Sequence, residues 1–416
     1  MLNPKTKQRE LAYTVKIDNI LPIEGSDNCE CAVVGGWKVM VRNGTFKVGD
    51  LAIYFEVDSK VDTTKREFAF LAKRNGKIKT QKYTFGGKGL MYSQGLLMHT
   101  NDFVDETGRI PAWLGVRNAI IASGGDIFAG DTRFLTKELG VVYADSEDNT
   151  RKASTPDKYK VMAQRNPNLF KSTIVKKIMR YKFGRKIMFF FFGKKKDKKN
   201  TWPSHIASKT DVERVQNCPW VFQNHKTYVA TEKIDGSSCS IMAERKKFGK
   251  INYYVCSRNV VFKDENQECF YDNNVYFEAY NKYNLKEIIT RILNDYNLPN
   301  VALQMEVFGD NIQKRNYSMK KGEHQIRVFH IVSNNVKFSM DEVAKICEKY
   351  GLPCVPIVDD NYQLPNTIEE LQAFVESEGS RIDGLPREGI VFYDKETGHE
   401  YFKFVSPEFL IKYHGG

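Results

Sequence analysis

The stretch TEKIDGSS, residues 231–238, follows a β-like run and places Lys233, Asp235 and Gly236 in the pattern K-x-D-G. Alone the pattern is weak, because three fixed residues recur by chance in about one chain in ten of this length. Asp-Gly is also an ordinary hairpin turn. A turn is nevertheless a good place to present a lysine side chain, so the structural and functional interpretations are compatible. The downstream sequence has to decide between them.

Five further short motifs follow in order, each with a polar or aromatic residue inside or beside a β-like run. They are SRN at 257–259, MEVFG at 305–309, RVFHI at 327–331, EGIV at 388–391 and FK at 402–403. Each motif taken alone is better explained by core packing or by an ordinary surface charge. Six motifs in this order are not, and they indicate a functional site centred on Lys233.

This ordered set resembles motifs I, Ia, III, IIIa, IV and V of the covalent nucleotidyltransferases. That superfamily includes ATP-dependent DNA ligases, RNA ligases and mRNA capping guanylyltransferases, and the resemblance covers residues 201–416. It implies that Lys233 is the catalytic nucleophile that becomes linked to AMP, with Glu306, Glu388 and Lys403 as further catalytic residues. It also implies a nucleotide pocket, with Phe329 stacking on the base, that is formed by Glu232, Lys233, Arg258, Glu306, Phe329, Glu388 and Lys403.

The implied reaction sets requirements on the charges around the lysine. Its amine must be deprotonated to attack the α-phosphorus of ATP, yet the unperturbed pKa of lysine is about 10.4. Nearby carboxylates favour the protonated amine unless a metal ion occupies them. We therefore expect Asp235, Glu306 and Glu388 to hold Mg²⁺ or Mn²⁺, directly or through water, because both ions prefer oxygen ligands. Arg258 and Lys403 would offset the charge that builds on the phosphates.

The amino-terminal pattern, from about residue 10 to 120, is β. Runs at 37–41 and 51–57 alternate with period two, and the first stops at Asn43-Gly44, the strongest short hairpin signal. Four or five short strands predict a small closed or partly open barrel, for which an OB-fold is the commonest choice related to nucleic acid. A basic and aromatic cluster suits single-stranded nucleic acid, and an ordinary surface loop explains it equally well. The cluster comprises Lys73, Arg74, Lys77, Lys79, Lys82, Tyr83 and Phe85.

The order of the domains discriminates within the superfamily. DNA ligases and capping enzymes place an OB domain after motif V, whereas here 13 of the 416 residues follow Lys403 and the barrel-like region comes first. This order resembles the RNA ligases with an N-terminal OB domain, as does the lead-in at 208–217. The resemblance implies an ATP-dependent RNA ligase that passes AMP to a 5′-phosphate and joins that end to a 3′-hydroxyl, at a nick or between free ends, in RNA repair.

One departure from the family pattern concerns motif V. Many ligases have K-x-K there, whereas Val405 fills the second position in this chain. Arg381 and Arg387 are candidates for the missing cation by residue type only. Two other classes of function stay open at this point: a DNA ligase or capping-type enzyme, which shares the first step, and a catalytically inactive RNA-binding relative. The second would have no need to keep Lys233 together with its acids.

The remaining half mixes helices and strands. Helices are expected at 285–293 and 341–350, strands at 251–256, 301–308, 326–332 and 389–393, and Thr210-x-x-Glu213 is a capping box that predicts a helix start. The chain is thus predicted to be α+β. An OB-fold-like, RNA-binding β-barrel occupies 1–125, a basic linker region 126–200, and a nucleotidyltransferase (adenylylation) domain of antiparallel sheets with flanking helices 201–416.

The net charge of +12 lies mostly in one block. Residues 171–199 hold twelve Lys or Arg and one acid, so the block alone carries +11. It is a candidate for attraction to phosphates or membrane surfaces, and a solvated linker is the ordinary alternative. Its apolar run at 187–192 is too short for a transmembrane helix, which takes roughly 20 residues. Without a secretory signal, and with eight cysteines in no zinc or disulfide pattern, we expect a cytoplasmic protein with no membrane partner. The sequence leaves the oligomeric state open, with a monomer as the default.

Overall fold

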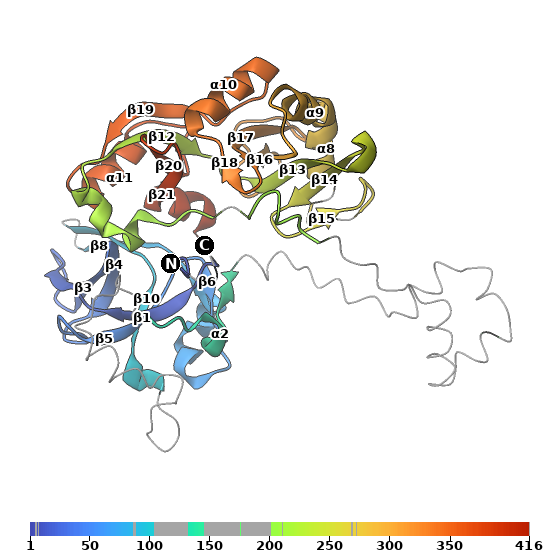
Figure 1. Cartoon of the computed structure of the whole chain (residues 1–416). Helices are drawn as coiled ribbons and strands as arrows, with labels where there is room; N and C mark the ends of the chain where they lie inside the picture. The colour runs from blue at the N-terminus through green and yellow to red at the C-terminus, as the bar shows by residue number, and fades with distance from the viewer. Residues whose placement is uncertain are drawn as a thin grey trace. The chain divides into compact units, whose positions relative to one another are not determined.

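The computed structural model describes residues 1–103, 132–144 and 201–415, with gaps at 5, 7, 86–88, 210, 268 and 272, and the isolated position 175. The chain divides into two compact units, residues 1–144 with 203–416, and residues 145–202. Apart from position 175, the basic block at 171–199 lies outside the described residues. The first unit holds an N-terminal domain and a C-terminal domain (Figure 1).

Short antiparallel sheets make up the N-terminal domain. β5 (Leu51–Phe55) pairs with β1 (Ala12–Lys16) and β10 (Leu96–His99), and β3 (Cys29–Val34) pairs with β2 (Asn19–Pro22) and β4 (Trp37–Arg42). β8 (Gln81–Phe85) pairs with β9 (Gly89–Ser93), and β6 (Ser59–Lys60) lies between β7 (Lys77–Ile78) and β11 (Val142–Tyr143). The helical segments are η1 (Arg66–Arg74), η2 (Thr100–Phe103) and α2 (Thr136–Leu139). The strands form separate sheets rather than one closed sheet.

Period-two alternation sets the inner face of these strands. In β4, Trp37 and Val39 are almost completely buried, whereas Arg42 at the strand end is exposed. The run ends at the predicted turn, where Gly44 has a φ of 73°, in the left-handed region that favours glycine. This turn does not join β4 and β5 as a hairpin, because β4 pairs with β3 and β5 pairs with β1 and β10. The sequence therefore located the turn but not the partner strand.

Residues 132–144, which the sequence analysis placed in the linker region, pack on the N-terminal sheets. The N–H of Leu135 donates to the carbonyl of Ala12 at 2.8 Å, and β11 pairs with β6. Leu135 and Leu139 are buried in the same core cluster as Phe55. The described part of the N-terminal domain therefore extends to Ala144.

Two antiparallel sheets with flanking helices form the C-terminal domain (Figure 1). One has the order β19-β12-β20-β21, with β12 at Thr227–Lys233, β19 at Ile357–Gln363, β20 at Gly389–Asp394 and β21 at Glu400–Val405. The other has the order β15-β14-β13-β16-β17-β18, with β13 at Ser237–Arg245, β14 at Ile251–Ser257, β15 at Val261–Phe262, β16 at Asn300–Gly309, β17 at His324–Ser333 and β18 at Val336–Lys337. The helices include α8 (Val275–Lys282), α9 (Leu285–Asp295), α10 (Met340–Tyr350), α11 (Ile368–Ser377) and α12 (Pro407–Phe409).

Most sequence-predicted elements of this domain are present. α9 and α10 match the two predicted helices, and β14, β16, β17 and β20 match the four predicted strands. α9 buries Leu285, Ile289 and Ile292 against the sheets, which explains its helical spacing of apolar residues. The helix predicted to start at the 210–213 capping box is wrong. Residues 211–214 are not helical, and only a short 3₁₀ turn, η5 (Val215–Asn217), follows.

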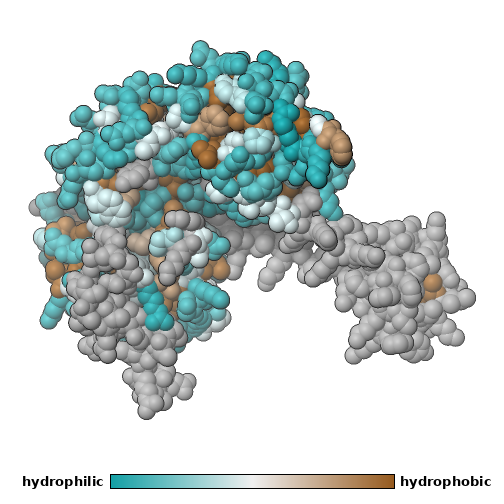
Figure 2. All heavy atoms as spheres, in the orientation of Figure 1, coloured by the Kyte–Doolittle hydropathy of each residue, from teal (hydrophilic) through white to brown (hydrophobic). Residues whose placement is uncertain are grey.

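Apolar side chains lie mainly inside the domains. On the face drawn in Figure 2, hydrophilic residues cover most of the described surface, and hydrophobic ones occur between them in small groups. Exposed large side chains such as Phe248, Val48 and Phe70 come from separate elements. No helix among the described residues is long and apolar enough to cross a membrane.

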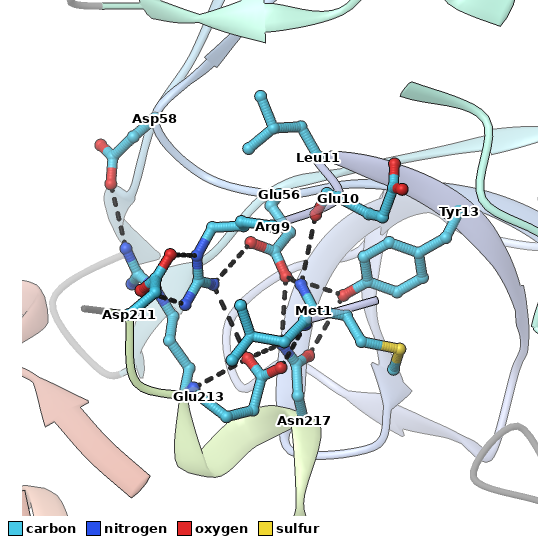
Figure 3. A network of polar contacts seen from close by, with 12 residues as sticks. Met1, Arg9, Glu10, Leu11, Tyr13, Glu56, Asp58, Asp211, Glu213 and Asn217 are labelled. Atoms are coloured by element: carbon cyan, nitrogen blue, oxygen red, sulfur yellow. Dashed lines mark hydrogen bonds and ion pairs between the residues drawn. The ribbon is translucent and has the colours of Figure 1, made fainter. Parts of the chain in front are cut away.

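A buried polar network joins the two domains (Figure 3). The side-chain oxygen of Asn217, Oδ1, accepts hydrogen bonds from Tyr13 Oη at 3.1 Å and from Trp37 Nε1 at 2.6 Å. Its amide group donates to Glu56 at 3.0 Å and to Glu213 at 2.8 Å. The side-chain amide of Asn217 thus both accepts and donates hydrogen bonds. These bonds hold the first residues of the C-terminal domain against the N-terminal strands.

Candidate active site

Lys233 is the last residue of β12, and its amine faces the start of β20. Backbone pairing sets Lys233 opposite Gly389, so the preceding Glu388 lies beside the lysine. Lys233 Nζ lies 2.7 Å from a carboxylate oxygen of Glu388. A side chain at Gly389 would put its Cβ 2.1 Å from the carbonyl oxygen of Phe404, so glycine is required where β20 and β21 meet. The strand register thus brings predicted motifs I and IV into contact.

The glycine of K-x-D-G brings a third motif to the same place. A Cβ at Gly236 would lie 2.4 Å from the carbonyl oxygen of Val307, so only glycine lets this turn approach β16 so closely. Beyond the turn, Ser238 pairs with Glu306. The carboxylate of Glu306 therefore lies on the strand next to β13, within electrostatic range of Lys233.

Three acids surround the lysine in a buried setting. Burial raises the pKa of Glu306 to about 8; Glu388 and Asp235 add to this shift and Lys233 opposes it. Burial also raises the pKa of Glu388. Burial alone would lower the pKa of Lys233, but Glu388 and Glu306 outweigh it and raise that pKa. The acids therefore favour the protonated form of Lys233, and a further cation beside them would be electrostatically favourable.

The donor set suits a hard divalent cation. Asp235, Glu306 and Glu388 offer only carboxylate oxygens, the ligands that Mg²⁺ and Mn²⁺ prefer, and Mg²⁺ usually keeps several of its waters. Among the residues that the structure describes, no group of three His, Cys, Asp or Glu side chains is arranged to hold one ion. The metal-binding role of the three acids, direct or through water, therefore stays a prediction.

Asp235 has two partners that the sequence analysis did not identify. Its N–H donates to Tyr317 Oη at 2.6 Å, and its carboxylate lies 3.2 Å from His414 Nε2. The carbonyl of His414 accepts a hydrogen bond from Lys79 of the N-terminal domain at 2.7 Å. No local motif marks His414, because it reaches Asp235 from 179 residues away. Lys79, predicted as part of an RNA-binding cluster, therefore also connects the two domains.

Arg258 and Lys403 meet at one anion, Asp211. Arg258 Nη2 lies 3.1 Å and Lys403 Nζ 3.2 Å from the carboxylate of Asp211. Burial, with Arg9 adding to it, lowers the pKa of Lys403 to about 7, although Asp211 opposes this shift. The residues expected to bind phosphates are thus close together and carry or can acquire positive charge, as a phosphate subsite requires.

The other predicted pocket residues occupy different settings. Phe329 is half-buried at an irregularity in the pairing of β16 and β17, where Gln304 pairs with His330 and Met305 with Val328. Such a bulge re-aims a side chain, which fits its predicted role of stacking on a base. Glu232 is buried and its carboxylate accepts hydrogen bonds from Ser380 Oγ and the Arg381 N–H. Glu232 thus holds the 380–381 segment, and its contact with a nucleotide stays a prediction.

The two arginines considered as substitutes for the second motif V cation differ in placement. Arg387 is buried and donates to the carbonyl and carboxylate of Glu378, so it is committed to that residue. The guanidinium of Arg381 donates to the carbonyl of Val358. Arg9 of the N-terminal domain and Arg214 both act electrostatically on Lys403. Arg9 lies outside the matched motifs, and Arg214 lies in the lead-in at 208–217, for which the sequence analysis assigned no residue roles.

Arg315 contacts two segments that carry residues of the site. It is almost fully buried, pairs with Asp383 and donates to the carbonyl of Pro386, two residues before Glu388. Its guanidinium lies 4.0 Å from the ring centre of Tyr317. Tyr317 in turn accepts the N–H of Asp235. One side chain therefore positions the segments that carry two of the three acids.

We expect Arg315→Ala to lower the free energy of unfolding by about 3–5 kcal/mol, because it leaves the buried carboxylate of Asp383 without its partner. Denaturant unfolding of the full chain measures this. Arg381→Ala is a matched control, since Arg381 is half-exposed and 3.9 Å from an exposed Glu378, and it should change stability by about 1 kcal/mol or less. Equal effects of the two substitutions would show that the buried pair has no special role.

Comparison with known families accords with this geometry. Residues 226–414 match the family model described as RNA ligase, and residues 11–98 match one described as an OB-fold domain. No curated protein matches the chain.

Solved structures of the Naegleria gruberi RNA ligase have the same fold over the whole chain. A lysine-to-alanine mutant with ATP and Mn has a TM-score of 0.64 at 22% identity. A lysine-to-methionine mutant with AMP and Mn has a TM-score of 0.65 at 24%, and a glutamate-to-alanine mutant with ATP and Mn has 0.65 at 23%. Each comparison covers 98% of this chain and 100% of the other.

The C-terminal domain is thus similar to the RNA ligase family over residues 226–414, and the N-terminal domain matches an OB-fold domain over residues 11–98. The α+β architecture and the N-terminal OB-fold that the sequence predicted are both confirmed.

Proposed function

We propose that this protein is an RNA ligase that uses ATP to join a 5′-phosphate to a 3′-hydroxyl of RNA through a lysyl-AMP intermediate on Lys233. The observation that carries the proposal is the contact of Lys233 Nζ with Glu388 at 2.7 Å, in a buried site with Glu306 and Asp235. Arg258 and Lys403 supply positive charge on the side of Asp211. A nucleophile, acids and phosphate-binding cations are the groups that nucleotidyl transfer requires.

The first step forms a bond from Lys233 Nζ to the α-phosphorus of ATP and breaks the bond to the oxygen that bridges to the β-phosphorus. Pyrophosphate leaves, and the amine loses its proton. Arg258 and Lys403 stabilise the charge on the phosphates. Phe329 orients the adenine by stacking, and Glu388 holds the amine in line.

Two exchanges at phosphorus follow. The 5′-phosphate of RNA attacks lysyl-AMP, which restores the free lysine and leaves AMP on the RNA end. The 3′-hydroxyl then attacks that RNA phosphate, loses its proton and releases AMP. The N-terminal OB-fold domain would hold the RNA strand, since this fold binds oligonucleotides elsewhere.

A divalent metal ion would complete the charge balance around Lys233. Asp235, Glu306 and Glu388 would hold Mg²⁺ or Mn²⁺, directly or through water, and the ion would supply positive charge that favours the neutral amine. The acids are arranged for this in advance, because burial raises the pKa of Glu306 to about 8 and a nearby cation makes its ionised form favourable. The three side chains approach from the turn after β12, from β16 and from the start of β20.

The cell compartment and the assembly belong to the same proposal. All eight cysteines are free thiols, which accords with a reducing cytoplasm. We propose a monomer that acts in RNA repair, because the N-terminal and C-terminal domains of one chain together hold every predicted site residue.

The test is strand joining by the full chain. With ATP and Mg²⁺ or Mn²⁺, RNA carrying a 5′-phosphate and a 3′-hydroxyl should be sealed, and a chelator should abolish sealing because the acids then have no cation to share. Nicked duplex and single-stranded RNA are compared in parallel by gel electrophoresis. Equal sealing of an all-DNA nick, or use of GTP in place of ATP, would contradict the proposal.

A further inference from the structure

Asp211 contacts cations from three distant parts of the chain. Its carboxylate lies 3.3 Å from Arg9 Nη2, 3.1 Å from Arg258 Nη2 and 3.2 Å from Lys403 Nζ. Its side chain is 13% exposed. Although burial opposes ionisation, Lys403 and Arg9 hold the pKa of Asp211 well below its usual range. Asp211 is therefore a permanent anion at neutral pH.

The backbone around Asp211 fixes its position beside β21. The N–H of Lys403 donates to the carbonyl of Glu213 at 2.8 Å, and Arg214 forms an isolated parallel bridge with Lys403. Arg9 also donates to the carbonyl of Val212 at 2.9 Å. The backbone that follows Asp211 is thus held beside β21 by contacts other than the ion pairs of its carboxylate.

Two of the three cations are those assigned to the phosphates of ATP. Arg258 and Lys403 hold Asp211 in this structure, and the exposed fraction of the Arg258 side chain, 53%, leaves it free to turn toward another anion. Lys403 has three N–H donors and Arg258 has five, so a phosphate that binds both cations also meets the like charge of the Asp211 carboxylate beside them. Asp211 and the phosphates therefore compete electrostatically for the same two cations.

The third cation links this exchange to the N-terminal domain. Arg9 is 7% exposed and also pairs with Glu56 at 3.1 Å (Figure 3). Glu56 belongs to the network in which Asn217 joins the domains. When the phosphates withdraw Arg258 and Lys403, Asp211 is left with Arg9 alone, so the pair across the domain boundary strengthens.

We propose that Asp211 is a positioning residue that occupies the phosphate subsite as an internal anion and competes with the di- and triphosphate groups of pyrophosphate and ATP. The proposal rests on the proposed function, since it takes Arg258 and Lys403 as phosphate-binding residues. By reciprocity, whatever holds Asp211 more firmly to Arg9 favours phosphate binding, and phosphate binding tightens the contact between the domains.

The test is binding of inorganic pyrophosphate to the full chain in Mg²⁺, measured by titration calorimetry. Asp211→Asn keeps the size of the side chain and removes the competing charge, so pyrophosphate should bind about fivefold tighter or more, within the usual range of coupling between sites. The KM for ATP in adenylylation should fall by a similar factor. Asp211→Glu, which restores the anion, should return both values toward wild type.

A matched control lies at the same domain boundary. Glu369 pairs with Lys38 of the N-terminal domain, and both side chains are exposed. Glu369→Gln should leave pyrophosphate affinity unchanged. Because Asp211→Asn can lower stability, Arg9→Lys is a second variant: it keeps a charge for Glu56 but loses the forked contact with Asp211. The released Asp211 should then weaken pyrophosphate binding about two- to threefold.

Unchanged or weaker pyrophosphate binding by folded Asp211→Asn would overturn the inference, since a merely structural aspartate can only weaken the site when it is removed. Should that variant not fold, unchanged or tighter binding by Arg9→Lys would overturn it. Failure of the proposed function is seen separately. If the wild-type chain neither binds pyrophosphate nor becomes labelled by ATP, the assignment of the site itself fails, whatever the variants do.

Discussion

Replacing Lys233 by alanine is expected to abolish all covalent labelling of the chain by α-labelled ATP. The amine at the end of β12 is the group placed among the three acids, and without it no phosphorus–nitrogen bond can form. Wild-type label should survive denaturation and be lost in acid but not in base, as a phosphoramidate is. Labelled protein is measured after denaturing electrophoresis, with Mg²⁺ or Mn²⁺ present.

Lys226→Ala is the matched control for this experiment. Lys226 lies just before β12 and pairs with Asp394 at 2.5 Å, away from the three acids. That variant should keep its label. Retention of label by Lys233→Ala would move the nucleophile to another residue and overturn the assignment.

Glu306→Ala and Glu388→Ala are each expected to lower sealing by about a hundredfold or more, because loss of one acid disturbs both the lysine and the cation that balances it. Glutamine keeps the shape but not the charge, so Glu306→Gln and Glu388→Gln should be nearly as impaired. Single-turnover adenylylation and strand joining are measured separately. The Glu388 substitutions should slow adenylylation directly, since the Glu388 carboxylate contacts Lys233 Nζ.

Glu396→Gln is the control for removal of a carboxylate. Glu396 is 84% exposed and 3.9 Å from Lys226, so its loss should leave both reactions unchanged. Wild-type sealing by either Gln variant at the site would show that Glu306 or Glu388 acts through packing or hydrogen bonding alone.

Sequence predicted the parts of the site that strands carry. Lys233, Glu306 and Glu388 stand at the ends or inside of β-like runs, and antiparallel register brings them together once the strand order is known. The strand order itself has no local signal. It depends on Gly236 and Gly389, whose close contacts with other strands are visible only in three dimensions.

The residues whose role the sequence did not indicate act over long range. Arg9 and His414 lie outside the motifs, and Asp211 lies in the lead-in at 208–217 without a predicted role. Arg9 is 202 residues from Asp211, Asp211 is 192 residues from Lys403, and His414 is 179 residues from Asp235. The spacing of Thr210 and Glu213 even predicted a helix that does not form. The carboxylate of Glu213 instead accepts a hydrogen bond from the Asn217 side-chain amide and pairs with Arg9 at 3.7 Å. A tertiary contact therefore overrides a local capping preference.

The position of Asn217 restricts how this protein can be re-engineered or can diverge. Its side-chain oxygen accepts hydrogen bonds from Tyr13 and Trp37 of the N-terminal domain, and its side-chain NH₂ group donates to Glu56 and Glu213, one from each domain. An OB domain grafted from another protein would have to bring matching donors and a matching carboxylate, or leave buried polar groups unpaired at a cost of about 1–3 kcal/mol each. Domain exchange and gradual sequence drift are therefore both confined to changes that occur in pairs across this boundary.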